Sequence, residues 1–365
     1  MTGAPSPFSS SYAQARQRLL EATAAAGLVA DALVHPLRGL QGEELALDVV
    51  RDGPADFPRL LIVSSACHGV EGFCGSGVQV AALRDAAWRA HAAAQGVAVL
   101  YLHALNPWGF AQMLRTTHEN VDLNRNFHDF SRPLPVNTAY AELHPLLVPA
   151  QWPPSADNEQ ALLRYVAERG QAAFQAAVSG GQYAFADGMF FGGSAPCWSN
   201  GALREVLRTH ARHATRIAWI DLHTGLGPSG LGERIFAGPD DAQAVRRARQ
   251  WWDSGGRTPV TSIYDGSSTS AMLTGMMWMA VGEECPQAEY TGIAMEYGTV
   301  PVLETLQAVR AGNWLHGHPE AAPELAQRIR RQVLDAFYTD TAQWKQQVLD
   351  QAQESMLQAV RGLGR

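Results

Sequence analysis

Residues 61–77 read LIVSSACHGVEGFCGSG, and this stretch decides how the rest of the chain is interpreted. The apolar run at 61–63 predicts a buried strand. A turn then carries His68 and Glu71, and an alanine-rich helical pattern begins after Gly77. Open α/β sheets keep their chemistry at this kind of place, where the carboxyl end of a strand leads through a loop into a helix. His68 and Glu71 stand three residues apart and therefore supply half of a candidate zinc site.

Strand and helix patterns alternate on both sides of this stretch. This alternation predicts an α/β fold: a mixed, mostly parallel twisted sheet flanked by helices on both faces. We expect a single domain over residues 1–365, with a core at about 28–316 and C-terminal helices at about 320–362 packed on it. The expected strands lie at 32–37, 44–50, 59–65, 96–102, 216–222, 259–263 and 293–295, and the expected helices at 10–26, 77–94, 155–178, 199–213, 240–253 and 320–360.

Composition and charge exclude several classes of function. The chain has 365 residues, 46% of them hydrophobic and 17% charged, which is ordinary for a globular enzyme. A formal net charge of -7 argues against nucleic acid or an anionic membrane as the main partner. No apolar run is long enough to span a bilayer, and no secretory signal is visible. The four cysteines form no C-x-x-C pair, so we expect free thiols and a cytoplasmic protein.

A third zinc ligand is expected from another strand end. Catalytic zinc takes three protein ligands and keeps one position open. His223 follows the apolar run at 217–220 and ends a predicted strand, as His68 does. Taken alone, His223 could equally be a hydrogen-bonded loop histidine, and an isolated His-x-x-Glu occurs often by chance. The placement of both motifs at strand ends of an α/β pattern favours a metal site.

Glu296 is a second ionisable residue at the mouth of a predicted strand. It comes directly after Gly-Ile-Ala-Met, where a carboxylate is costly to desolvate unless a positive group lies close. Water on a zinc ion is such a partner, because the metal lowers its pKa to about 7 and a nearby carboxylate can accept its proton. The alternative is an ordinary strand-end glutamate paired with a surface arginine.

The segment at 115–127, RTTHENVDLNRNF, is polar and contains two arginines among amides. Guanidinium groups bind carboxylates through two parallel hydrogen bonds and stabilise oxyanions. Such a loop, with Arg115 at its start and Arg125 near its end, can therefore bind an anionic substrate. The alternative is that it is only solvated surface.

Together these motifs resemble the zinc carboxypeptidase superfamily, which includes aspartoacylase and succinylglutamate desuccinylase. The resemblance covers roughly residues 58–300, and VDLNRNF is its most specific motif. Within the superfamily, the chain is similar in particular to a bacterial carboxypeptidase-like branch. It implies one zinc ion held by His68, Glu71 and His223. It also implies Glu296 as general base and acid, Arg115 as the oxyanion-stabilising residue, Asn124 and Arg125 as ligands of the substrate carboxylate, and a capping tyrosine for which Tyr264 is the first candidate and Tyr290 the second.

The expected function is that of a zinc-dependent hydrolase cleaving an amide bond next to a free carboxylate. A metallocarboxypeptidase acting on small peptides is the first interpretation. An N-acyl amino acid deacylase is the second, because Thr224-Gly225 after the third ligand is closer to the deacylase pattern DLHT than to the peptidase pattern. A non-catalytic metal-binding or peptide-binding module is the third interpretation. Such a module would be expected to lack Glu296 or one of the zinc ligands, and this sequence retains all of them.

Overall fold

The strands form one eight-stranded sheet in the order β1-β2-β4-β3-β5-β8-β6-β7, and the strands at its centre run parallel. This computed structural model describes residues 6–253 and 258–365. The pairs β4–β3, β3–β5, β5–β8 and β6–β7 are parallel, and β1–β2, β2–β4 and β8–β6 are antiparallel. The strands are β1 (Ala30–Arg38), β2 (Glu44–Asp52), β3 (Arg59–Ser65), β4 (Ala98–His103), β5 (Arg216–Ser229), β6 (Gly232–Phe236), β7 (Val260–Thr261) and β8 (Glu289–Gly298).

Helices fill the connections and cover the sheet. They are α1 (Tyr12–Ala25), α2 (Gly72–Arg84), α3 (Ala86–Ala94), α4 (Pro107–Gln112), α5 (Thr138–Leu147), α6 (Ala156–Arg169), α7 (Gln171–Ser179), α8 (Trp198–Val206), α9 (Ala242–Trp252), α10 (Met279–Glu284), α11 (Val302–Gly317), α12 (Pro323–Phe337) and α13 (Ala342–Gly364). Two short 3-10 helices, η1 (Gly69–Glu71) and η2 (Leu123–Arg125), and a π-helical turn, η3 (Leu207–Ala211), complete the set.

Alternate side chains of each central strand enter two separate cores. In β3, Leu61 and Val63 join a cluster formed with α1, α2, α9 and α13. Leu60 and Ile62 join a second cluster with α8, η3 and α10 on the opposite face. Because successive side chains of a strand point to opposite faces, a strand buried on both sides is apolar throughout, as β3 is. The predicted fold class, a mixed and mostly parallel sheet between helices, is confirmed.

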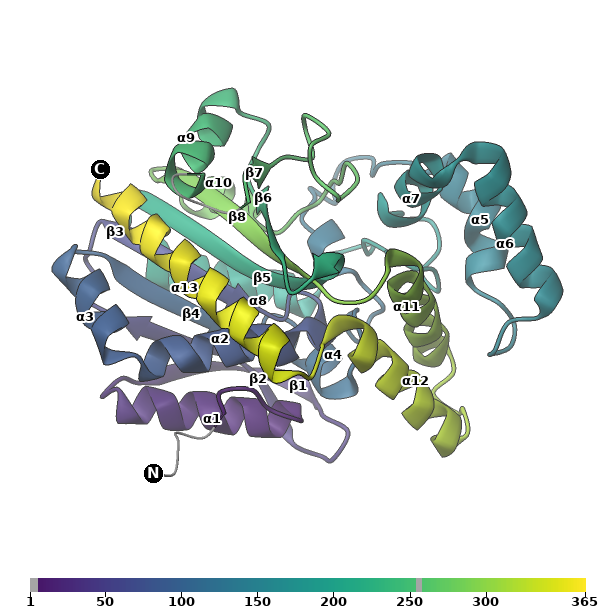
Figure 1. Ribbon diagram of the computed structural model, residues 1–365, viewed down its shortest axis with the longest axis horizontal. Helices are drawn as coiled ribbons and strands as arrows, with labels where there is room; N and C mark the ends of the chain where they lie inside the picture. The colour runs from purple at the N-terminus through teal and green to yellow at the C-terminus, as the bar shows by residue number, and fades with distance from the viewer. Residues whose placement is uncertain (1–5, 254–257) are drawn as a thin grey trace.

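Figure 1 shows how these layers are arranged. The last helix, α13, drawn in yellow, runs across one face of the sheet above α2. Helices α5, α6 and α7, in teal, form a lobe at one end of the molecule, next to α11. The carboxyl ends of β3, β5 and β8 point toward this lobe, so the space between the sheet and the lobe is where the chemistry of the strand ends is expected.

Some predicted helix boundaries were wrong. The helix expected at 77–94 begins at Gly72 and is divided, because the Asp85 side chain accepts hydrogen bonds from the first backbone N–H groups of α3. The helix expected at 155–178 is divided at Gly170, whose positive φ of 85° ends α6. Helix α11 and strand β6 were not predicted.

All four cysteines are buried free thiols, as expected. Among the helices of the described residues, none is both long and apolar enough to cross a bilayer.

Candidate metal and substrate site

His68 and Glu71 are positioned by η1, the single turn between β3 and α2. His68 keeps extended backbone angles at the end of the strand, and Glu71 closes the turn. The Gly69 and Val70 N–H groups donate to the carbonyls of Arg115 and Leu114 at 3.0 and 2.9 Å, which ties the turn to the loop after α4. His68 Nδ1 lies 2.8 Å from Glu71 Oε1 as a result.

His223 reaches the same point from β5. Its Nδ1 lies 2.9 Å from Glu71 Oε2. One ligand atom each from His68, Glu71 and His223 lie within 4.8 Å of one another, and all three side chains are buried. The structure thus brings together the three residues predicted as metal ligands, although they are separated by as many as 155 positions in the sequence.

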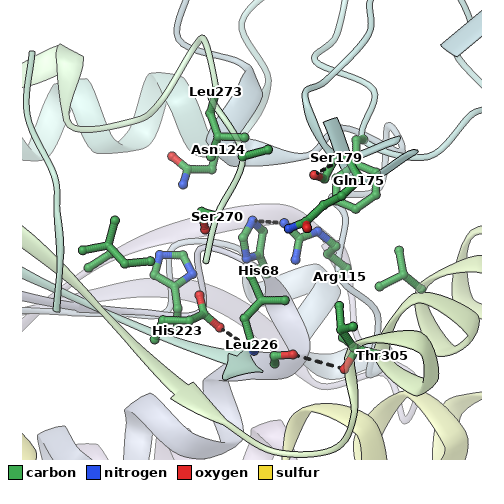
Figure 2. A pocket seen from close by; sticks show the side chains of 18 of the residues that line it. His68, Arg115, Asn124, Gln175, Ser179, His223, Leu226, Ser270, Leu273 and Thr305 are labelled. Carbon is green, nitrogen blue, oxygen red and sulfur yellow. Dashed lines mark hydrogen bonds between the residues drawn. The ribbon is translucent and has the colours of Figure 1, made fainter. Parts of the chain in front are cut away.

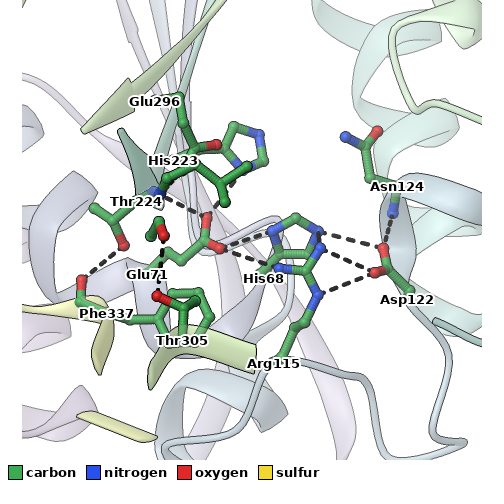
Figure 3. A network of polar contacts seen from close by, with 12 residues as sticks. His68, Glu71, Arg115, Asp122, Asn124, His223, Thr224, Glu296, Thr305 and Phe337 are labelled. Atoms are coloured by element: carbon green, nitrogen blue, oxygen red, sulfur yellow. Dashed lines mark hydrogen bonds and ion pairs between the residues drawn. The ribbon is translucent and has the colours of Figure 1, made fainter. Parts of the chain in front are cut away.

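Two aspartates that were not predicted as site residues hold the outer nitrogens of these histidines. His68 Nε2 lies 3.3 Å from Asp122 Oδ1 (Figure 3). His223 Nε2 contacts Asp221 Oδ2. Asp221 in turn accepts a 2.5 Å hydrogen bond from Ser64 Oγ. A carboxylate on the outer nitrogen fixes the tautomer in which the other nitrogen can bind a metal. Sequence signals were present, since Asp122 lies in VDLNRNF and Asp221 is two positions before His223, on the same strand face.

Charges in this buried cluster balance through close contacts. Burial by itself would raise the pKa of Glu71, but the imidazoles of His68 and His223 lower it to about 2. Burial works to lower the pKa of His223, but Asp221 and Glu71 raise it well above its usual value. Burial also works to raise the pKa of Asp122, but two neighbouring arginines and His68 hold it well below its usual range. Ionised carboxylates are therefore gathered in a buried place, as a divalent cation requires.

The donor set fits zinc. Two imidazole nitrogens and a carboxylate are a catalytic zinc set, and each imidazole has its outer partner. A second group, Cys67, Asp221 and His223, also has ligand atoms within 4.8 Å of one another. Burial, together with the nearby Asp221, raises the pKa of the Cys67 thiol well above its usual value. Because a thiolate and not a thiol binds metal, the set with His68 and Glu71 fits better.

Glu296 stands beside this cluster on the neighbouring strand. It is paired directly with His223 in the parallel ladder of β5 and β8, so both side chains leave the same face of the sheet. Its Oε1 accepts a hydrogen bond from Leu226 N at 3.1 Å. Burial raises the pKa of Glu296 to about 8, and the charge of Glu71 adds to this effect. The alternative of a strand-end glutamate paired with a surface arginine does not hold, because the side chain is only 8% exposed and lines a pocket.

Arg115 lies on the other side of His68. Its Nε donates to Asp122 Oδ2 at 3.0 Å, and its Nη1 lies 3.5 Å from Glu71 Oε1. Its Nη2 lies 2.7 Å from His68 Nε2 (Figure 3). Of these two neighbours of His68 Nε2, only Asp122 can accept its proton, because the guanidinium of Arg115 can only donate. Arg115 is therefore held at the edge of the cluster by two carboxylates.

Asn124 and Arg125 also face the cavity. The Asn124 side-chain oxygen accepts a hydrogen bond from Met277 N at 3.0 Å. Arg125 donates to the carbonyls of Asn124 and Ser179 at 2.9 and 2.6 Å, and its buried Nε has no hydrogen-bond partner among the described residues. A buried guanidinium with an unused donor is suited to an anionic ligand.

The family is decided by a match over nearly the whole chain. The profile described as "Protein of unknown function (DUF2817)" matches residues 8–351. The chain belongs to the DUF2817 family. No curated protein matches it.

Solved structures similar to this DUF2817 protein include the following two. Bovine thrombin-activatable fibrinolysis inhibitor, solved with tick carboxypeptidase inhibitor, has 11% identity and a TM-score of 0.46, over 90% of this chain and 99% of that one. A Pseudomonas aeruginosa metallo-carboxypeptidase, solved with (2-guanidinoethylmercapto)succinic acid, has 14% identity and a TM-score of 0.39, over 88% and 66%. Both are likenesses to solved structures, at identities of 11% and 14%.

One cavity of the DUF2817 protein is lined by the three candidate metal ligands together with Glu296, Arg115, Asn124 and Arg125. Its empty volume is about 1160 Å³, part of it open to solvent. Figure 2 shows some of the side chains that line it. Apolar residues of its lining include Ile235, Ile263, Leu273, Met276, Trp278 and Ala294.

Tyr264, predicted to bind substrate, does not line this cavity. Its hydroxyl donates to the Gly238 carbonyl at 2.8 Å, and its ring packs against Phe236. Tyr290, the other candidate tyrosine, is half-buried and also lies outside the cavity lining. The predicted capping role of Tyr264 has no support from this placement.

Proposed function

We propose that this protein is a zinc-dependent hydrolase that cleaves an amide bond adjacent to a free carboxylate. One observation carries the proposal: a single cavity holds two histidines and a glutamate within ligand distance of one point, a separate buried carboxylate, and two arginines. These are the parts that amide hydrolysis needs, namely a Lewis acid, a proton carrier, an oxyanion partner and an anchor for the substrate.

Proton transfer is assigned to Glu296. His68, Glu71 and His223 would hold one zinc ion, which would polarise the scissile carbonyl and acidify a water molecule. Glu296 takes a proton from the attacking water and passes it to the leaving amine. The Leu226 N–H holds one carboxylate oxygen in place at 3.1 Å and so limits the rotation of the group.

The arginines and Asn124 bind the negative charges of the substrate. Arg115 stabilises the oxygen that becomes negative when water adds to the carbonyl, because its guanidinium lies beside His68 and Glu71. Asn124 and Arg125 bind the free carboxylate through amide and guanidinium N–H groups. On this proposal, the carboxylate lies on one side of the metal ligands and the rest of the substrate on the other.

Two substrate classes satisfy these requirements. A metallocarboxypeptidase acting on small peptides and an N-acyl amino acid deacylase differ only in the group on the acyl side of the scissile bond. The deacylase is retained because the cavity wall on that side is apolar, as Leu226, Val302 and Leu306 show. A cytoplasmic location is part of the proposal for either class.

The test combines a metal assay with one substitution. We expect the purified protein to contain about one zinc ion per chain and to hydrolyse peptides or N-acyl amino acids that carry a free carboxylate. Glu296→Gln should retain the zinc and lower kcat by about 100-fold to 10,000-fold, because it removes the proton carrier and keeps the shape of the side chain. Glu304→Gln, an exposed glutamate of α11, is the matched control and should leave kcat unchanged.

Three results would contradict the proposal. Turnover by Glu296→Gln close to that of the parent would remove its assigned role. A protein that binds no divalent metal would remove the metal site. A zinc-loaded protein that hydrolyses neither peptides nor N-acyl amino acids would instead support a non-catalytic metal-binding module.

A further inference from the structure

The cavity continues beyond the metal ligands, away from Asn124, to the first half of α11. Figure 2 and Figure 3 both place Thr305 of α11 on the opposite side of His68 from Asn124. We call the side chains of this part of the cavity the α11 wall. It consists of Leu226, Val302, Leu303, Leu306 and Val309.

The residues of the α11 wall are all apolar. Residues 302, 306 and 309 follow one another at helical spacings of four and three, so they lie on one face of α11. Two of the wall residues are also large exposed side chains, since Val302 is 45% exposed and Leu303 is 56% exposed. Exposed apolar side chains at the mouth of a cavity that leads to reactive groups indicate a surface that a ligand covers.

Three polar side chains that line the same cavity, those of Thr305, Gln175 and Ser179, already donate hydrogen bonds within the protein. Thr305 Oγ1 donates to the Gly225 carbonyl at 3.1 Å. Gln175 Nε2 donates to the Thr269 carbonyl at 2.9 Å, and Ser179 Oγ donates to the Gln175 carbonyl at 2.7 Å. A peptide lying here would bury carbonyl groups that these donors do not serve, and each such group would weaken binding. A hydrocarbon chain has no such groups.

We propose that the α11 wall binds the hydrocarbon chain of an N-acyl amino acid, so that the preferred substrates are amino acids acylated with a medium or long alkyl chain. The inference rests on the proposed function, because the carboxylate bound by Asn124 and Arg125 sets the direction of the substrate. Water supplies a hydroxyl to the acyl carbon and a proton to the nitrogen as the C–N bond breaks. The products are a fatty acid and a free amino acid.

The substrate series that tests this varies only the acyl chain. N-acetyl-, N-butyryl- and N-octanoyl-leucine are compared with a leucine-terminated tripeptide on the zinc-loaded full-length protein. Leucine is chosen because many of the side chains that line the cavity are apolar. We expect kcat/KM to rise with chain length, by up to about fourfold for each methylene that the wall buries, and to exceed the value for the tripeptide.

Variants locate the effect on the α11 wall. Val302→Thr with Leu303→Asn should lower the ratio of kcat/KM for octanoyl over acetyl substrate by about tenfold or more, since it makes the exposed part of the wall polar. Val136→Thr with Leu163→Asn alters two other exposed apolar residues, 86% and 67% exposed, and should leave that ratio unchanged. Both double variants change side chains that are largely exposed, so folding should be retained.

The outcomes separate this inference from the proposed function. Turnover that does not rise with chain length, or a tripeptide preferred over octanoyl-leucine, overturns the α11 wall assignment and leaves amide hydrolysis standing. If no substrate is hydrolysed, the proposed function fails. Calorimetric binding of octanoyl-leucine to zinc-loaded Glu296→Gln then tests separately whether the α11 wall binds the hydrocarbon chain. Binding weakened about tenfold by Val302→Thr with Leu303→Asn would support the assignment of the α11 wall to the acyl chain. Equal binding would overturn that assignment.

Discussion

At the scale of single residues, each histidine of the site has two nitrogens with different partners. Nδ1 of His68 and of His223 faces Glu71, and Nε2 of each faces an aspartate. An imidazole that donates one N–H to a carboxylate is both oriented and made more basic at its other nitrogen. In the proposed metal site, the aspartates would therefore raise metal affinity without binding the metal themselves.

Removing either aspartate charge should weaken zinc binding. Asp122→Asn and Asp221→Asn are each expected to lower zinc affinity by about 10-fold to 100-fold, measured by competition with a chromophoric chelator. Glu119→Gln, an exposed carboxylate in the same loop as Asp122, is the control and should bind zinc as the parent does. Parent-like affinity in both aspartate variants would show that the two contacts do not support the metal ligands.

At the scale of elements, the site depends on a close approach between η1 and α4. A Cβ atom added at Gly69 would lie 2.1 Å from the carbonyl carbon of Gly109 and 2.3 Å from the Phe110 nitrogen. Both contacts are to backbone, which cannot move aside without displacing a helix. Gly69 separates His68 from Val70 and Glu71, so the contact also determines where the two ligands of this turn lie.

The substitution Gly69→Ala should therefore destabilise the protein. We expect a loss of roughly 1–3 kcal/mol in the free energy of unfolding, measured by urea denaturation, and weaker zinc binding as the turn shifts. Gly201→Ala in α8 is the matched control, because nothing lies within 4 Å of the added Cβ. There the change should be neutral or stabilising by up to about 1 kcal/mol, since alanine favours helix. Equal effects at the two positions would refute the close-packing argument.

At the scale of the whole molecule, burial of titratable groups links stability to pH. His103, at the end of β4, is fully buried, and its Nε2 lies 2.9 Å from Ser76 Oγ. Burial lowers the pKa of His103 from 6.5 to about 4. Between these values the unfolded chain binds a proton that the folded protein does not, so the contribution of His103 to stability is present above pH 6.5 and is lost as pH falls toward 4. Glu296 acts in the opposite direction, because its pKa is raised to about 8.

A comparison with a variant isolates the histidine from the other groups. From pH 7.5 to pH 5, the stability advantage of the parent over His103→Gln should shrink by about 2 kcal/mol, because only the parent contains the suppressed titration. Urea denaturation at both pH values measures it. His213→Gln, at an exposed position, is the control and should show no such change. An advantage that is constant with pH would mean that His103 is protonated in the folded protein.

The sequence alone determined the class of fold and the places where chemistry is concentrated. Apolar runs that end in ionisable residues are local patterns, so the strands before His68, His223 and Glu296 could be predicted without any knowledge of neighbouring elements. Parallel strands bring their carboxyl ends to one edge, and this made convergence of the three residues a sound expectation. Cap and break positions such as Asp85 and Gly170 were also local but were overlooked.

The tertiary structure alone decided which partners those residues meet. Asp122 faces His68 because a loop returns across 54 positions of sequence, and Tyr264 turns to the Gly238 carbonyl instead of the cavity. Helix α11 completes the far wall, although nothing in its own sequence indicates that it lies beside the metal ligands. The physical reason is that side-chain direction in a loop, and the packing of a helix against a sheet, depend on contacts distant in sequence, whereas strand and helix periodicity depends on neighbours along the chain.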